Sequence, residues 1–136
     1  MTTPPTGRDL TFVSWASRVD EMKRMDDGSS PLARPTALAS LVDYQPEAVV
    51  SRALLKSPGG SLTVFAFAEG EGLSEHTTPH EAVVLILDGE AQISIGGMRV
   101  EVRTGEALRL PAHVPHAVHA RTRFKMLLSM IRSPVS

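Results

Sequence analysis

The sequence predicts an all-β domain in which many short strands close into a barrel. Apolar runs of strand length follow one another between Ala48 and Arg132, with turn residues between them and no helical spacing. The pairs Asp88-Gly89 and Gly96-Gly97 each separate two apolar runs, a pattern that favours hairpin turns. We prefer a barrel to an open sandwich because closing a sheet removes its exposed edges.

The expected strands are joined by short loops that contain glycine, proline or aspartate. The segment SPGG at residues 57–60 predicts the first hairpin, because it lies between two apolar runs. The last run, KMLLSMIR at residues 125–132, is apolar on both faces, which predicts burial on both sides or against a partner. We place strands at residues 48–56, 61–68, 73–78, 82–87, 91–95, 98–103, 106–110, 116–121 and 124–132.

Residues 1–35 are interpreted as a leader and a short helix that precede the barrel domain at residues 36–136. The first nine residues are rich in threonine and proline, which predicts a leader without fixed structure. Between Leu10 and Met25 the apolar residues recur at three- and four-residue spacings, as is typical of a short amphipathic helix. The breaker cluster at 26–35 predicts a loop, and residues 36–44 predict a helical turn or an edge strand.

The composition restricts the classes of partner and site. Fourteen basic and fifteen acidic residues nearly cancel, and aromatic residues make up only 4%, so a nucleic-acid surface is not indicated. The absence of cysteine excludes a disulfide, a thiolate zinc site and a cysteine nucleophile. No segment approaches the ~20 apolar residues of a membrane span, and the N-terminus lacks the features of a secretory signal. We therefore expect a cytoplasmic protein with no membrane partner.

Three histidines near the ends of expected strands are the candidate functional residues of the barrel. His76 and His80 lie on either side of a Thr-Thr-Pro turn, and His116 follows at the start of a later strand. Because side chains alternate along a strand, His76 and Thr78 point the same way, and His80 lies near the strand end. If the two strands are neighbours, His116 stands opposite His76, and the histidines face one cavity mouth.

Two groups of residues have a regular spacing, Gly70, His76 and Gly89 in the first and Gly105, Pro111 and His116 in the second. This spacing resembles the two sequence motifs of the cupin family. In the second motif, His113 takes the place of a glycine and Ala120 the place of an asparagine. The resemblance implies a small single-domain protein of the RmlC-like cupin type, with a double-stranded β-helix, or jelly-roll, barrel and a short helical segment before it. It also implies a homodimer.

Cupins commonly hold a divalent metal with three histidines and one glutamate, and here that motif is degenerate. His76 and His116 keep two of the four ligand positions, while Thr78 and Ala82 occupy the other two. If the turn after Thr78 bends inward, His80 joins them and completes a three-nitrogen site suited to zinc, iron, nickel or copper. The sequence therefore predicts His76, His80 and His116 as metal ligands.

Three further residues near the motifs have two interpretations each. Glu81 lies one position before the expected glutamate and is a weak candidate for a general base, or else an exposed carboxylate at a strand start. His113 either lines the cavity mouth or points into solvent from its loop. His119 lies three residues after His116, which predicts that it faces the opposite side of the same strand.

The sequence leaves the function open among three classes. The first is a metal-dependent cupin enzyme of the dioxygenase or isomerase type, motivated by His76 and His116 in motif register. The second is a metal-free module that binds or senses a small molecule without catalysis, motivated by the lost glutamate. The third is a mainly structural homodimer that pairs strands 48–56 and 125–132 across subunits. A small-molecule ligand in a histidine-lined cavity is expected in the first two.

Overall fold

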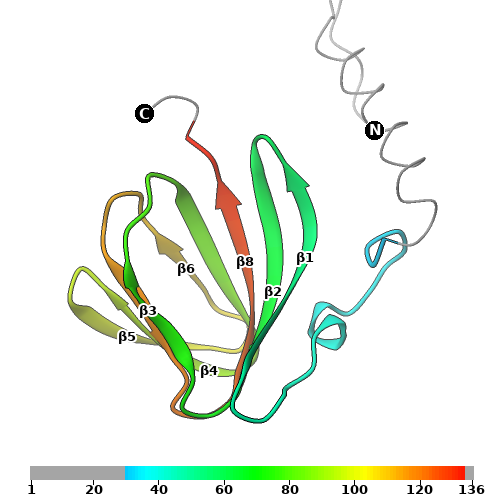
Figure 1. The fold of residues 1–136 in the computed structure, drawn as a ribbon, viewed down its shortest axis with the longest axis horizontal. Coiled ribbons are helices and arrows are strands. Elements are labelled where there is room, and N and C mark those ends of the chain that lie inside the picture. Colours follow the sequence, from blue (N-terminus) through cyan, green and yellow to red (C-terminus); the bar gives the residue numbers. More distant parts are fainter. Residues whose placement is uncertain (1–29, 134–136) are drawn as a thin grey trace, which may run out of the picture. The chain divides into compact units, whose positions relative to one another are not determined.

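The computed structural model describes residues 30–133, and residues 36–133 of it form one compact β unit (Figure 1). The leader and the helix predicted between Leu10 and Met25 lie outside the described residues. In the part of the chain that the structure describes, no helix has both the length and the apolar character needed to cross a membrane.

The predicted all-β fold is confirmed. One short 3-10 helix, η1 (Leu38–Leu41), lies within the segment for which the sequence predicts a helical turn or an edge strand. Within residues 30–133, eight strands follow: β1 (Val49–Ser57), β2 (Gly60–Phe67), β3 (Gly72–His76), β4 (Glu81–Ile95), β5 (Met98–Arg103), β6 (Ala107–Leu110), β7 (His116–His119) and β8 (Phe124–Ile131).

The strands form two layers that share the long strand β4. In the first layer the order is β1, β2, β8, the first half of β4 and then β6, and in the second it is β3, β7, the second half of β4 and then β5. Every pair of neighbours is antiparallel. Figure 1 shows the layers curling around a common interior, with the C-terminal strand β8 inserted between β2 and β4.

The hairpin predicted at Asp88-Gly89 is wrong, because β4 runs without interruption from Glu81 to Ile95. The pairing register of β4 with β8 shifts between Ile86 and Asp88, and Gly89 has a φ of 77°. A β-bulge with a glycine in the left-handed region bends a strand instead of reversing it. The bend carries β4 from the first layer into the second, so a local turn signal marks the point where the chain changes layers.

The other two predicted hairpins are confirmed. Gly96 and Gly97, with φ values of 57° and 83°, form a two-residue turn that pairs Ile95 with Met98. A turn with positive φ at both central residues matches the twist of the strands that it joins. Around residues 57–60, the first and last residues of the SPGG segment are paired across β1 and β2.

The interior between the layers holds the main apolar core. Phe67 and Phe124 stack with ring centroids 4.5 Å apart, and neither has any exposed surface. A second apolar cluster lies on the opposite face of the first layer, where η1 and the chain after it cover Val64. Strand β8 contributes to both, with Met126 inside and Leu127 outside. At this point the strand is fully buried on its inner face and partly buried on its outer face, so the predicted burial on both faces holds only in part.

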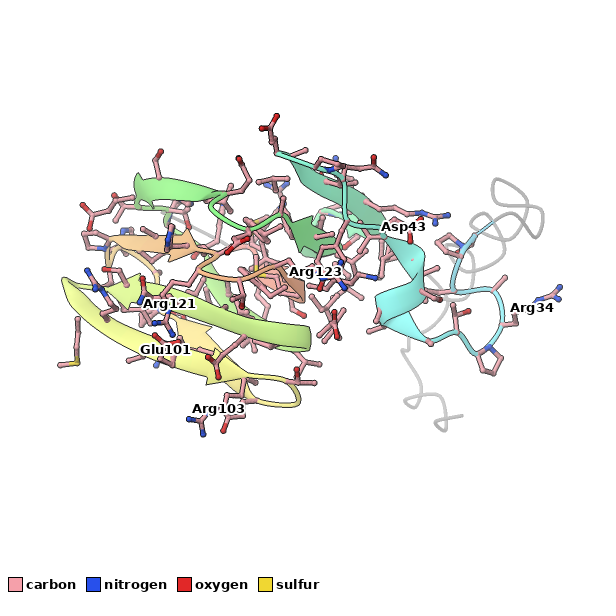
Figure 2. All side chains as sticks on the ribbon, turned by 90° about the horizontal axis from the view of Figure 1, so that it is seen from below. Arg34, Asp43, Glu101, Arg103, Arg121 and Arg123 are labelled. Atoms are coloured by element: carbon pink, nitrogen blue, oxygen red, sulfur yellow. The ribbon has the colours of Figure 1, made fainter. Side chains whose placement is uncertain are left out.

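The outward face of the second layer is charged and exposed to solvent. Arg121 contacts Glu101 at 3.3 Å and Glu90 at 3.9 Å, and Arg103 contacts Glu90 at 3.2 Å (Figure 2). All four side chains are at least one third exposed, so these pairs contribute at most about 1 kcal/mol each. This outward face holds solvated ion pairs. The residues of the candidate site lie on the inward face of the layer.

Candidate functional site

His76 and His116 face each other inside the second layer, as the sequence predicts. His76 ends β3, His116 begins β7, and the two residues are direct partners in the antiparallel ladder. Their imidazole rings meet edge to face, with centroids 4.4 Å apart and planes inclined at 66°. The two histidine-bearing motifs of the sequence therefore form one site.

Backbone carbonyls fix the tautomer of each ring in its neutral form. Nδ1 of His76 lies 2.9 Å from the carbonyl oxygen of Ser74, and Nδ1 of His116 lies 3.3 Å from that of Val114. A carbonyl oxygen can only accept, so in each case Nδ1 carries the proton and donates it. Nε2 of each neutral ring is then a free acceptor, because a neutral imidazole carries only one proton.

The two histidines differ in exposure and hence in their tendency to be charged. His116 is only 8% exposed, whereas His76 lies open to solvent. Burial lowers the pKa of His116 below its usual value of 6.5, and the neighbouring His76 lowers it further, against the opposing effect of the Val114 carbonyl. His116 is therefore neutral at pH 7 and presents a lone pair to the barrel interior.

A small pocket adjoins this pair and has mostly apolar walls. Its volume is about 110 Å³, and both layers contribute to it. Methionines of β8 form part of the wall opposite the histidines. An occupant would therefore meet apolar surface on most sides and imidazole on one. The lining residues are Leu73, His76, Thr78, Ala82, Leu110, His116, Val118, Met126, Leu128 and Met130.

The sequence motifs identify the two histidines of this pocket, but they do not name most of the apolar residues that line it. Val118 follows His116 by two residues, so strand alternation places it on the same face. The same argument joins Leu128 to Met126 and Met130 on β8. The alternation of side chains along a strand, counted from a residue already assigned to the pocket, is therefore the sequence pattern that could have predicted these apolar lining residues.

His80 does not line the pocket that His76 and His116 share. The Thr78 hydroxyl accepts a hydrogen bond from the His80 N–H at 3.0 Å and donates to the His80 carbonyl at 3.2 Å, which fixes the turn. Nδ1 of His80 accepts from the N–H of Ser133 at 3.2 Å, and the Ser133 hydroxyl donates to the Pro79 carbonyl at 2.6 Å. The turn is thus joined to the end of the chain after β8, and the structure brings together two of the three predicted ligands.

Glu81 is engaged in contacts that hold the loop at residues 111–115. Its carboxylate accepts from Nε of Arg109 at 2.7 Å and from the N–H of Ala112 at 3.2 Å. These hydrogen bonds lower the pKa of Glu81, so it is ionised at pH 7. Glu81 is not among the residues that line the pocket. These contacts give it a structural task, while its role as a general base stays a prediction.

His113 and His119 lie outside the pocket as well. His113 is exposed and has a φ of 66°, and its N–H donates to the Thr78 carbonyl at 2.7 Å. The left-handed conformation explains why a glycine suits this motif position. His119 is exposed on the face of β7 opposite His116, as predicted, and lines an outer groove with Arg99.

The residues present do not fit the four-ligand metal centre that the cupin motifs describe. Within residues 30–133, no group of three or more histidine, cysteine, aspartate or glutamate side chains is placed to hold a metal ion. Ala82 offers no donor, and the Thr78 hydroxyl is bonded to the backbone of His80. Two imidazole nitrogens remain at the pocket, fewer than the three protein ligands of a catalytic zinc site.

Comparison with solved structures finds close matches in fold. A conserved protein of unknown function from Streptococcus pyogenes is 31% identical with a TM-score of 0.72, over 76% of this chain and 90% of the other. A cupin superfamily protein from Desulfitobacterium hafniense is 36% identical with a TM-score of 0.71, over 74% of this chain and 93% of the other.

A third match, a Cupin 2 conserved barrel domain protein from Leptotrichia buccalis, is 39% identical with a TM-score of 0.67. It is matched over 69% of this chain but only 46% of its own length, so this chain spans about half of that protein. No curated protein matches the chain. The family model of the cupin domain matches residues 63–131, which contain both histidine motifs and every strand from β3 to β8. Together with the two-layered barrel, these matches show that the chain belongs to the cupin superfamily.

Proposed function

We propose that the barrel is a metal-independent binding module for a small, mostly apolar molecule that carries one hydrogen-bond donor. The observation that carries this proposal is the pairing of two Nδ1 atoms with backbone carbonyls, which leaves two Nε2 acceptors beside an apolar pocket. A buried acceptor without a partner is costly, so the pocket favours a ligand whose donor faces the imidazoles.

The size of the pocket limits the ligand to about the size of a single aromatic ring. Its volume of about 110 Å³ is on the order of that of an apolar cavity that takes up benzene. The burial of His116 supports the acceptor role, because a neutral imidazole accepts hydrogen bonds over the whole neutral pH range. A phenol or a small alcohol with an apolar body has the required chemistry.

Binding of phenol and toluene, which have similar shapes, tests the proposal. In the presence of EDTA, phenol is expected to shift the NMR signals of His116 and the Met126 methyl group, and toluene to bind more weakly because it has no donor. The variant His116→Leu should lose the preference for phenol. The matched control His119→Leu, on the outer face of the same strand, should keep it. Equal binding of phenol and toluene to the unchanged protein would contradict the proposal.

A second candidate function is a divalent metal centre in which His76 and His116 are the only protein ligands from the pocket. A specific observation favours it, because metal-binding histidines commonly donate their second N–H to a backbone carbonyl, as both do here. A small-molecule ligand would then have to supply the remaining donors. The sequence-based choice of zinc, iron, nickel or copper belongs to this candidate, and so does an enzymatic role.

Metal titration separates the two candidates and also tests His80. If the ion is held by the ring pair, His76→Ala and His116→Ala should each abolish its binding, while His80→Ala should leave it unchanged. Loss of binding in His80→Ala would restore the three-histidine site predicted from the sequence. If none of the four metals binds at equimolar concentration, this second candidate fails and the first is unaffected.

A further inference from the structure

A second pocket lies outside the barrel and shares no residue with the first. Its volume is about 400 Å³. Three separate segments form it, namely the chain before β1, the loop after β2 and the turn before β8. Figure 2 shows Arg123 beside the segment that carries Asp43. The lining residues are Tyr44, Gln45, Pro46, Ala68, Glu69, Thr122 and Arg123.

An aromatic platform holds Arg123 in this pocket. The central carbon of its guanidinium group lies 4.4 Å from the ring centroid of Tyr44. The Tyr44 hydroxyl donates to Asp88 at 2.5 Å, which anchors the ring. Nζ of Lys125 lies 5.0 Å from the same centroid and donates to the Ala39 carbonyl at 2.6 Å. A guanidinium stacked on a ring keeps the N–H groups at its edge available for hydrogen bonds.

Arg123 and Glu69 line the pocket as opposite charges that form no ion pair. Two residues before Arg123, Arg121 pairs with Glu101 and Glu90. Within residues 30–133, the side chains of Arg123 and Glu69 form no hydrogen bond or ion pair, with each other or with any other group. Apart from the stacking of Arg123 on Tyr44, the pocket thus offers one cation and one anion whose hydrogen-bonding groups are available to an occupant.

We propose that this pocket binds a small zwitterion of the α-amino acid class. The carboxylate of the ligand lies on the guanidinium edge of Arg123, which suits a two-pronged hydrogen bond, and its ammonium group lies on Glu69. A simple anion would be repelled by Glu69, and a simple cation would be repelled by Arg123. The side chains of Gln45 and Thr122 add hydrogen-bonding groups around the ligand.

The shape of the pocket agrees with a ligand of this size. A volume of about 400 Å³ lies at the lower end of the range for small-molecule sites. Pro46 and Ala68 supply an apolar wall that the ligand side chain can contact. The site is independent of the barrel pocket, so it can bind its ligand whether or not the proposed barrel function is correct.

The test measures binding of each of the twenty common α-amino acids by NMR, with the backbone amides of Gln45, Glu69 and Arg123 as reporters. For the best ligand, two comparison compounds are titrated, the carboxylic acid and the amine that carry the same side chain. We expect each to bind roughly tenfold more weakly or worse, because each leaves one charge of the pocket without a partner. Equal binding of the acid alone would overturn the proposal in favour of a plain anion site.

Variants test the two assigned contacts. Arg123→Ala and Glu69→Gln should each weaken binding of the best amino acid roughly tenfold or more. The matched control Arg121→Ala removes an exposed arginine that does not line the pocket, so it should bind like the unchanged protein. Unchanged binding in Glu69→Gln, a conservative surface replacement, would overturn the zwitterion assignment. So would the failure of all twenty amino acids to shift the three amides at millimolar concentration.

Discussion

The imidazole rings of His76 and His116 are in edge-to-face contact, 4.4 Å between centroids, across two neighbouring strands of the barrel. One ring is exposed and the other is buried, so the pair extends from the barrel mouth to its interior. Charge on both rings at once is unfavourable, because like charges at this distance repel and the inner ring is also poorly solvated. His116, the inner ring, is therefore the neutral acceptor of the pair at pH 7.

The lowered pKa of His116 predicts a loss of stability in mild acid. Its folded-state pKa lies below the unfolded value, so the unfolded chain binds the proton first as the pH falls. The stability that neutral His116 contributes is complete above the unfolded pKa and is lost as the pH falls through the folded pKa. Urea unfolding at about pH 7.5 and about pH 5 should therefore show a smaller loss for His116→Leu than for the unchanged protein. A loss of equal size would contradict this.

Two glycines with positive φ should differ in their tolerance of alanine. Gly105 has a φ of 88° and open space where a Cβ would stand, so Gly105→Ala should cost only the left-handed backbone strain, about 1–2 kcal/mol. A Cβ on Gly89 would lie 2.5 Å from the carbonyl oxygen of Arg123, in addition to a φ of 77°. Gly89→Ala should therefore lower the free energy of unfolding by clearly more. Equal losses in urea unfolding would show that the bend of β4 does not depend on this close approach.

The contacts of Glu81 predict local loosening when its charge is removed. In Glu81→Gln the hydrogen bonds to Arg109 and to the N–H of Ala112 are weakened, since a neutral amide is a poorer acceptor than a carboxylate. Hydrogen exchange at the Ala112 amide should become faster, with little change at β2. Glu90→Gln is the matched control, because Glu90 also pairs with arginines but does not contact the 111–115 loop. If both variants exchange alike at Ala112, the loop does not depend on Glu81.

We propose that the chain forms a homodimer through the outer face of the first layer. Val83 on β4 and Ile131 on β8 are 39% and 61% exposed on this face, so a second copy that covered them would bury apolar surface. Sedimentation equilibrium should show a dimer, and the double variant Val83→Glu and Ile131→Glu should shift it to the monomer. Met98→Glu, at an exposed hairpin end, should remain dimeric. A monomeric unchanged protein would rule the dimer out.

Much of the fold follows from patterns within short stretches of sequence. Strand alternation and two-residue turns such as Gly96-Gly97 depend on residues that are close in the chain, and these predictions are confirmed. Motif spacing predicts the facing of His76 and His116 only if their strands are neighbours, and the pairing of β3 with β7 meets that condition. Asp88-Gly89 shows the limit of such patterns. A glycine with positive φ serves a turn or a bulge equally well, and only the partner strands of β4 decide between them.

What the sequence determined by itself is the all-β barrel and the strand ends on which His76 and His116 lie, while the pairing of those strands is a tertiary result. Only the tertiary structure decided which other side chains belong to a site, because the residues that they contact are far away in the sequence. His80 is directed away from the pair by a hydrogen bond from Ser133, and Glu81 is held by Arg109. Tyr44 meets Arg123 only after the chain has folded, so the outer pocket has no signature in any single segment.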